Sequence, residues 1–273
     1  LTNNTEEELK KKILNIWKEM NRSIYNGMQQ TGELTGKMKI KRRANLLYKK
    51  LIKRSSEVVT ANTDILKSLG SAIAKRDSDT NAHNYRVTYN SVKLAEELGL
   101  KDLLIRSLIK GAFLHDIGKV GISDSILLKP GQLTVEEFET MKTHVHIGAD
   151  IILNINWLKD ALDVISFHHE RFDGSGYLSG LKEKDIPQVA RIFAIADVFD
   201  ALLSRRPYKD PVTFAKTMSI LREGSGTHFD PIFLKVFERI APTLYADIYA
   251  EKNEERQSEQ LNLVLKKYFT LDM

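Results

Sequence analysis

The chain has 273 residues, of which 42% are hydrophobic, so it can form one large core with a smaller unit, or two modest domains. It contains no cysteine, which excludes disulfides, thiolate metal sites and cysteine nucleophiles and agrees with a cytoplasmic location. The net charge of +5 mildly favours anionic partners. We find no apolar run that could span a bilayer and no signal-peptide pattern. The first residue is Leu rather than Met, which is compatible with a piece of a longer protein.

Most of the chain has apolar residues at the spacing of a helix. Apolar residues recur three and four positions apart from Leu9 to Ile24, and a long helical pattern resumes at Ile40 and continues to Ile73. Short connections rich in Gly, Pro, Asp and Ser separate the later helical segments, and alternating, strand-like runs are few. The sequence therefore predicts an all-α fold with three parts: a small N-terminal helical unit at 1–60, a larger helical domain at 61–241, and a helical tail at 242–273.

A strongly basic stretch lies within residues 37–54, which carry nine Lys or Arg residues and no acidic one. One interpretation is contact with nucleic acid or an acidic membrane. The other is the solvated face of a helix whose Leu46, Leu47 and Leu51 pack inward or against a second subunit. We favour the second because the sequence shows no base-reading or stacking module. Residues 1–60 are therefore predicted to act as a sensor or dimerisation segment, and no nucleic-acid polymer is expected as a partner.

Five histidines occur in polar clusters where apolar segments end. They are His83, His115, His144, His168 and His169. Asp116 adjoins one of them, and Asp197 lies in a strongly apolar stretch where an unpaired carboxylate would be costly to bury. Imidazoles and carboxylates without a thiol suit Fe, Mn, Ni, Co or Zn better than Mg or Ca. The combined pattern is therefore typical of a transition-metal site.

Long motifs now connect these residues to a known family. They read "HNYRV", "FLHDIGKVGISDSILLKPGQLT", "MKTH", "FHHERFDGSGY", "IADVFDAL", "RRPYK" and "GTHFDP", in that order. In order and spacing this series resembles the HD-GYP family of HD-domain metallophosphohydrolases, over about two thirds of the chain. The resemblance implies an all-α, multi-helix HD-type domain that hydrolyses the bacterial second messenger cyclic di-GMP to linear pGpG and, in some members, to GMP.

The resemblance also implies a ligand set for two or three divalent transition-metal ions, with Fe or Mn expected. The matching positions are His83, His115, Asp116, His144, His168, His169 and Asp197. Neighbouring histidines point about 100° apart on a helix, so His168 and His169 would reach different parts of a long metal cluster. Asp116 has two oxygens and is expected to bridge two ions. In this chemistry a metal-bridging hydroxide is the nucleophile.

Four further positions match residues that act on the substrate in the family. Lys119 aligns with the family lysine near the scissile phosphate, so that it and Asp116 are the predicted catalytic residues. Tyr177 is the tyrosine of the GYP motif, and its hydroxyl suits a phosphate oxygen. Arg206 and Lys209 match the phosphate-binding pair, which suits a substrate with two phosphodiesters.

Two positions depart from the family pattern. Leu178 stands where the family usually has proline, which is expected to change the stiffness of the loop but not the chemistry. Asp79, four residues before His83, stands where members with a third metal have glutamate. Residues four apart share a helix face, so Asp79 is predicted as a ligand for a third ion, with Asp77 as the alternative.

The remaining polar residues have open or structural interpretations. Asp200 lies one turn after Asp197 and either orients a metal ligand or caps local structure. His146 is expected to face away from the cluster, and His228 is expected to be structural.

Rival functions stay open at this point. One is an HD hydrolase that acts on another cyclic or linear dinucleotide, since nothing in the spacing identifies guanine. Another is a non-catalytic cyclic di-GMP receptor, which we disfavour because the ligands, the lysine and the phosphate-binding residues are all present. The expected partners are cyclic di-GMP as substrate and a second copy through the N-terminal helices. Metal identity, metal number, the final product and the sensed signal are left open.

Overall fold

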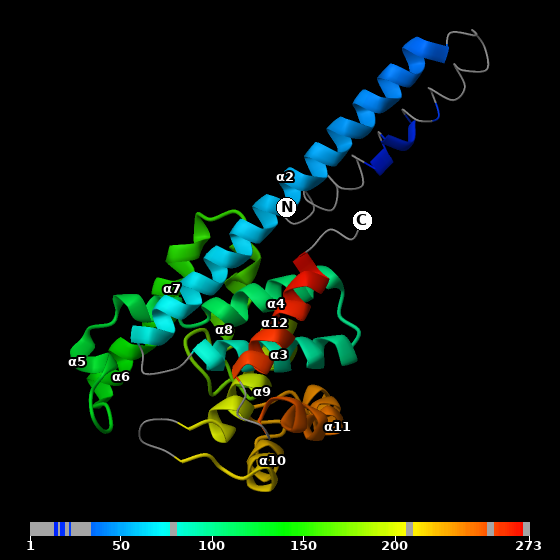
Figure 1. Ribbon diagram of the computed structural model, residues 1–273. Coiled ribbons are helices and arrows are strands. Elements are labelled where there is room, and N and C mark those ends of the chain that lie inside the picture. Colours follow the sequence, from blue (N-terminus) through cyan, green and yellow to red (C-terminus); the bar gives the residue numbers. More distant parts are fainter. Residues whose placement is uncertain are drawn as a thin grey trace. The chain divides into compact units, whose positions relative to one another are not determined.

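The structure, a computed structural model, describes residues 14–15, 17–19, 22, 34–76, 81–205, 210–249 and 254–269, without the side chains of 34–40, 81 and 254–256. Every named element in these ranges is a helix, which confirms the predicted all-α class (Figure 1). The chain divides into two compact units, residues 1–63 with 270–273 and residues 64–269. Within the described ranges, no helix is both long enough and apolar enough to cross a membrane.

Short connections join the helices. The α-helices are α2 Leu34–Arg76, α3 Asn81–Glu97, α4 Asp102–Leu114, α5 Asp124–Leu127, α6 Val135–Lys142, α7 His144–Leu153, α8 Leu162–Phe167, α9 Gln188–Leu203, α10 Phe214–Glu223, α11 Pro231–Ile248 and α12 Glu254–Phe269. The 3-10 helices are η1 Ile117–Gly121, η2 Lys159–Ala161 and η3 Glu183–Asp185.

Capping side chains explain where two of these helices begin. Thr134 and Glu137 form a capping box before α6, so that each side chain bonds the other residue's backbone N–H. Asp230 accepts the backbone N–H of Ile232 at 2.8 Å, and Pro231 occupies the first position of α11. Proline is well suited to that position because its missing N–H would have no partner there.

Helix α9 is the centre of the larger unit. It packs against α3, α4, α8, α10 and α11. Its sequence, QVARIFAIADVFDALL, is apolar on nearly every side, which is typical of a helix that is buried all round. Phe193 and Phe199 are fully buried, and each such side chain contributes about 1.5–3 kcal/mol to stability. On this helix the carboxylate of Asp200 is fully buried and that of Asp197 is partly buried, so both need polar partners.

The C-terminal helices belong to the same unit as the predicted catalytic domain. The predicted boundary at residue 242 falls inside α11, and α12 packs against α3 and α4. The Lys67 ammonium on α2 donates to Asn262 Oδ1 on α12 at 2.7 Å. In the structure, α12 and the end of α11, which fall within the predicted helical tail at 242–273, belong to the compact unit 64–269.

A glycine allows η1 to lie directly on α7. A Cβ atom at Gly118 would overlap the carbonyl oxygen of His144 and the backbone nitrogen of Gly148. Backbone atoms cannot move aside as a flexible side chain can. A Cβ at Gly121, in the same 3-10 helix, would instead meet the side chain of Ile147 at 2.9 Å.

We predict that Gly118→Ala lowers the free energy of unfolding by about 2–3 kcal/mol, because η1 must separate from the backbone of α7. Gly121→Ala is the matched control, and its cost is expected to be smaller because Ile147 can change its rotamer. Urea denaturation followed by circular dichroism measures both. Equal losses of stability in the two variants would contradict the proposed reason.

Candidate metal centre

The predicted metal ligands come from five places in the larger unit, most of them at helix ends. They are His83 on α3, His115 and Asp116 between α4 and η1, His144 at the start of α7, His168 and His169 directly after α8, and Asp197 on α9. Helix ends suit this purpose because the last carbonyl groups of a helix have no partner within it and can accept hydrogen bonds from side chains.

These side chains form two groups of three ligands. One group is His83, His115 and Asp197, and the other is His144, His168 and His169. Within each group the candidate ligand atoms all lie within 4.8 Å of one another. Ligand atoms that share one ion at about 2.0–2.2 Å are close enough together to meet this limit. Each group can therefore hold one metal ion.

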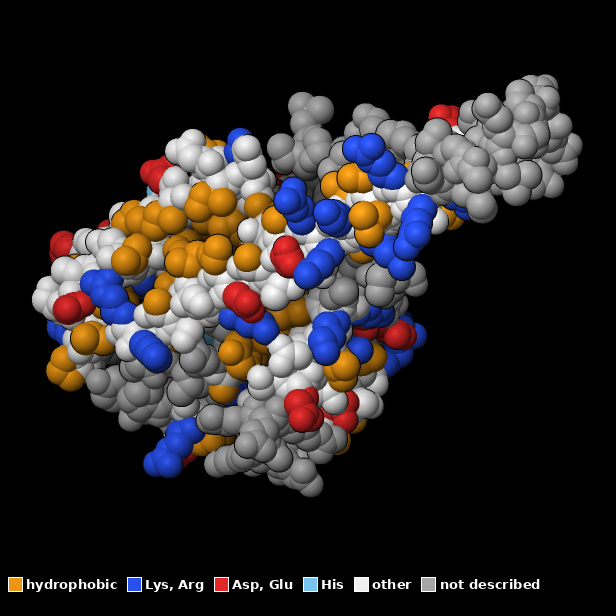
Figure 2. Space-filling view, turned by 45° about the horizontal axis from the view of Figure 1, so that its top comes forward, with side chains coloured by type: hydrophobic (Ala, Val, Ile, Leu, Met, Phe, Trp, Pro, Cys, Tyr) orange, Lys and Arg blue, Asp and Glu red, His pale blue; other side chains and the backbone are white. Residues whose placement is uncertain are grey.

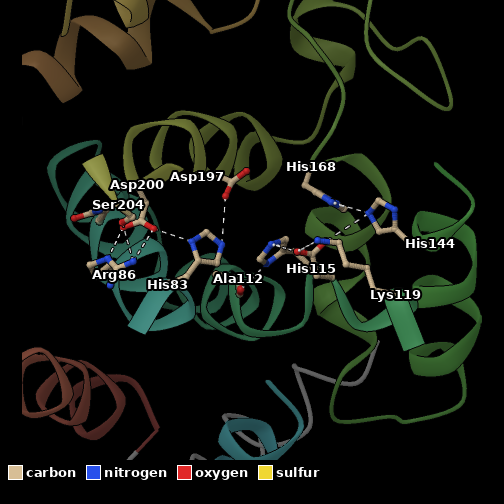
Figure 3. Close-up of polar contacts among 12 residues, drawn as sticks. His83, Arg86, Ala112, His115, Lys119, His144, His168, Asp197, Asp200 and Ser204 are labelled. Carbon is tan, nitrogen blue, oxygen red and sulfur yellow. Dashed lines mark hydrogen bonds and ion pairs between the residues drawn. The ribbon is translucent and has the colours of Figure 1, made fainter. Parts of the chain in front are cut away.

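Asp116 connects the two groups. Its Oδ2 atom lies 3.0 Å from His115 Nε2, and its Oδ1 atom lies 3.6 Å from His144 Nε2. Figure 3 shows His115 and His144 among the polar contacts of the site. One carboxylate oxygen thus faces each group. This geometry supports the bridging role that the resemblance implies for Asp116.

Backbone carbonyls fix the imidazoles of three histidines. In each case Nδ1 bonds the carbonyl oxygen three residues earlier: His115 with Ala112 at 2.9 Å, His144 with Met141 at 2.7 Å, and His168 with Ile165 at 2.9 Å. A carbonyl oxygen only accepts, so Nδ1 carries the proton and Nε2 is the atom left for the centre. Such outer partners orient the histidine ligands of metal sites.

Burial keeps the second histidine pair neutral. It lowers the pKa of His168 well below its ordinary value and that of His169 to about 3, with repulsion from neighbouring imidazoles adding to the shift of His168. Burial also opposes protonation of His115, but the carboxylates of Asp116 and Asp197 outweigh it and raise the pKa of His115 to about 9. At neutral pH, His115 without a metal is therefore protonated, whereas His168 and His169 are not.

The donor set fits divalent transition metals. His144 Nε2 and His168 Nε2 are 3.4 Å apart, and both present lone pairs because both Nδ1 atoms bond to the backbone. Two lone pairs that face each other in a buried site repel, and a cation between them would satisfy both. Imidazole nitrogens with one or two carboxylate oxygens suit Fe, Mn or Zn better than Mg or Ca.

The comparisons with known proteins agree with this geometry. The family model described as HD domain matches residues 67–232, more than half of the chain. The chain belongs to the HD domain family. It is 41% identical over 197 residues to a cyclic di-GMP phosphodiesterase of Thermotoga maritima, covering 71% of this chain and 53% of that protein. It is 40% identical over 170 residues to the 3'3'-cGAMP-specific phosphodiesterase 2 of Vibrio cholerae, covering 62% and 33%.

These relatives confirm the resemblance to the HD-GYP branch of the HD domain family. A solved structure of a cyclic GMP-AMP-specific phosphodiesterase of V. cholerae has a TM-score of 0.58 at 19% identity, covering 76% of this chain and 55% of that one. This likeness shows that the HD fold is shared. The chain spans about half the length of the first curated relatives it matches. Membership of the HD domain family implies divalent metal binding.

Asp200 orients a ligand of this HD domain, which decides between the two roles left open for it. Its Oδ2 atom lies 2.7 Å from His83 Nδ1, so the Nε2 atom of His83 faces Asp197 at 3.6 Å. Arg86 Nε donates to Asp200 Oδ1 at 2.6 Å, and the hydroxyl of Tyr249 donates to the same oxygen at 2.7 Å. Asp200 is fully buried, so these partners hold its charge in the interior.

Two of the four residues expected to act on the substrate lie beside the predicted ligands. Lys119 Nζ is 2.9 Å from Asp116 Oδ2. The ring of Tyr177 stacks on His169, with centroids 4.6 Å apart and planes at 27°. The peptide bond between Tyr177 and Leu178 is cis.

Some predictions cannot be followed in the structure. The predicted ligand Asp79, its alternative Asp77 and the predicted phosphate-binding residues Arg206 and Lys209 lie outside the described residues. The two histidines without a predicted metal role are described. His146 is exposed, and the ring of His228 stacks on Phe229 with centroids 4.3 Å apart. Neither belongs to the two ligand groups.

Three residues that support the site had no role in the predictions from the sequence. Arg86 is three residues after His83, so the helical period could have placed both on one face. Glu170 directly follows the histidine pair and is buried, and its Oε1 atom accepts the backbone N–H of Ser179 at 2.7 Å, beyond the tyrosine of the GYP motif. Tyr249, directly after α11, had no signal in the sequence, because it belongs to none of the motifs.

We predict that Asp200→Asn weakens metal binding at the His83 group by about 10–100-fold, because His83 loses its charged outer partner and Arg86 loses its counter-charge. The group that contains His144 should keep its affinity. Titration with Mn(II) followed by calorimetry resolves the two sites. Asp150→Asn, which removes an exposed carboxylate from α7, is the control and should match the parent. Two unchanged affinities in Asp200→Asn would refute the orienting role.

We predict that metal uptake near pH 7 releases roughly one proton from His115, because a protonated imidazole cannot be a ligand. The pKa of about 9 means that affinity rises with pH up to that value and then levels off. Calorimetry with Mn(II) in buffers of different ionisation enthalpy gives the proton count. Uptake without proton release at pH 7 would contradict the protonated state of His115.

Proposed function

We propose that this chain is a metal-dependent phosphodiesterase that hydrolyses cyclic di-GMP to pGpG, and that the linear product can be cut again to GMP. The observation that carries the proposal is the pair of three-ligand groups with Asp116 between them, one oxygen facing each group. Curated relatives about 40% identical are named as cyclic di-GMP or cGAMP phosphodiesterases. Phosphodiester hydrolysis by two ions requires such a divided but connected site.

The residues of the chain divide the chemistry between them. Divalent ions held in the two groups would activate water and neutralise charge on the phosphate. The Lys119 ammonium, 2.9 Å from Asp116, is placed to offset charge that develops on the phosphate or to give a proton to the leaving oxygen. Tyr177 stacks on His169 and presents its hydroxyl to a phosphate oxygen. Arg206 and Lys209 are proposed to bind the second phosphate.

The identity of the proposed substrate rests on the relatives, because a metal site binds phosphate and does not distinguish one base from another. The T. maritima relative is named for cyclic di-GMP, and the V. cholerae relative is named for 3'3'-cGAMP. The second name makes 3'3'-cGAMP the next candidate substrate. A non-catalytic receptor is disfavoured, since Lys119 and Tyr177 both stand beside a full set of ligands.

The metals proposed are Fe or Mn, in two sites, with a third ion if Asp79 also binds. The absence of cysteine supports a cytoplasmic location.

A homodimer through the N-terminal helices is proposed from α2, where Leu47, Leu51 and Val58 are 59%, 44% and 59% exposed. Their spacing of four and seven residues is that of a coiled-coil seam. Hydrophobic and basic side chains share this exposed surface (Figure 2).

We predict that the protein, purified without oxygen and loaded with Fe(II) or Mn(II), converts cyclic di-GMP to pGpG, and that a chelator abolishes the conversion. Chromatography over time identifies the products and shows whether GMP follows. Asp116→Asn should retain the helical circular dichroism of the parent but lose at least about 100-fold in rate, because a neutral amide bridges two cations poorly.

Parallel reactions with 3'3'-cGAMP rank the two candidate substrates. Faster turnover of 3'3'-cGAMP would transfer the proposal to that dinucleotide. Failure of a folded, metal-loaded sample to cut either one would refute the proposed activity, and binding without turnover would favour a receptor.

A further inference from the structure

The last residue of α2 contacts the backbone of η1, the 3-10 helix that carries Lys119. Arg76 Nη1 donates to the carbonyl oxygen of Lys119 at 2.9 Å and to that of Val120 at 2.5 Å. Arg76 Nη2 donates to the carbonyl oxygen of Ile122 at 2.7 Å and to Asp124 Oδ1 at 2.9 Å. Figure 1 shows this end of α2 next to α5. One guanidinium thus bonds four acceptors in a single short segment.

Three of these four acceptors are backbone carbonyl oxygens, so the contact of Arg76 differs from an ordinary ion pair between two surface side chains. The carboxylate of Asp124 is 68% exposed, so that pair alone would contribute little. Carbonyl groups at the end of a short 3-10 helix have few partners of their own. The donors of arginine are held in a rigid planar fork, so they fix the segment they bond in position as well as satisfying it.

The same 3-10 helix, η1, also rests on α7. Gly118 allows backbone-to-backbone approach to His144 and Gly148, and η1 and α7 pack extensively. Segment 117–122 is therefore held both by α7 and by Arg76. Asp116, which faces both ligand groups, immediately precedes this segment, and Lys119 lies inside it.

We propose that Arg76 is a positioning residue, through which the end of α2 sets the placement of Lys119 and Asp116. The consequence for catalysis rests on the proposed phosphodiesterase function. Because α2 is one helix of 43 residues that begins at Leu34, a movement or rotation of its last turn changes the contacts that hold η1. Residues 1–60, proposed as a sensor, are thereby connected to Lys119 through α2 and the hydrogen bonds of Arg76.

Two variants that each remove one positive charge from the same helical turn test this role. Arg76→Gln loses the fork, whereas Lys75→Gln is the matched control, because Lys75 is exposed and no contact between it and η1 is found among the described residues. Arg76→Lys adds a third arm, since it keeps the charge but cannot bond four acceptors at once. Thermal melting of all three establishes that each is folded at the assay temperature.

The first measurement does not depend on activity. Hydrogen–deuterium exchange of the peptide that covers 117–123 should accelerate about tenfold in Arg76→Gln, the change expected when one or two net hydrogen bonds of local stability are lost. Arg76→Lys should lie between Arg76→Gln and the parent, and Lys75→Gln should match the parent. Parental exchange in Arg76→Gln would overturn the proposal, as would the same acceleration in Lys75→Gln.

The second measurement is turnover of cyclic di-GMP by the Mn(II)-loaded variants. Arg76→Gln should lose about 10–100-fold in kcat with KM within about twofold of the parent, because misplaced reacting groups slow the chemical step without changing the remote phosphate contacts. An unchanged kcat in Arg76→Gln would overturn the link to Lys119. If the parent itself cuts no dinucleotide, the phosphodiesterase proposal fails, while the exchange result still decides whether Arg76 holds η1.

Discussion

Lone pairs that face one another in a buried space are the constraint on which this structure depends. His144 and His168 bring their Nε2 atoms to 3.4 Å, and each has already used its Nδ1 proton on a backbone carbonyl. Protonation of either ring is opposed, because burial lowers the pKa of both histidines. Neither ring can turn away without breaking its carbonyl bond. Such an arrangement is unfavourable in an empty interior and favourable around a cation, so the fold that imposes it is a fold built to bind metal.

The way the helices end explains how a helical protein meets this constraint. The last carbonyls of a helix lack intrahelical N–H partners, and a histidine placed three residues later can bond one of them. His115 and His168 do so at the ends of α4 and α8. His83 lies in the first turn of α3, where the carboxylate of Asp200 takes the same part. That carboxylate is bonded in turn by Arg86 on α3 and by Tyr249 directly after α11, so residues far apart in the sequence support this one imidazole.

Most of the candidate ligands could be singled out in the sequence because each is an unusual residue where an apolar pattern ends. The grouping could not be predicted, since the motifs give an order along the chain and no distances between motifs. Asp200 shows the limit: helical spacing puts it on the face of Asp197, but the residue it bonds lies in α3. Tyr249 lies beyond the matched HD domain, which ends at 232, so neither spacing nor resemblance pointed to it. Arg76 looked like any basic residue at the end of a helix, where cations are common.

The choice of a 3-10 helix after the His115–Asp116 pair has its own physical reason. In a 3-10 helix, residues three apart eclipse each other, whereas in an α-helix they are offset by about 60°. The N–H of Lys119 bonds the carbonyl of Asp116 at 2.9 Å, which closes such a turn, and the two side chains meet at 2.9 Å on one face. The tight turn therefore joins, within four residues, the carboxylate that faces both ligand groups and the ammonium beside it, and it can do so only because Gly118 adds no side chain between η1 and α7.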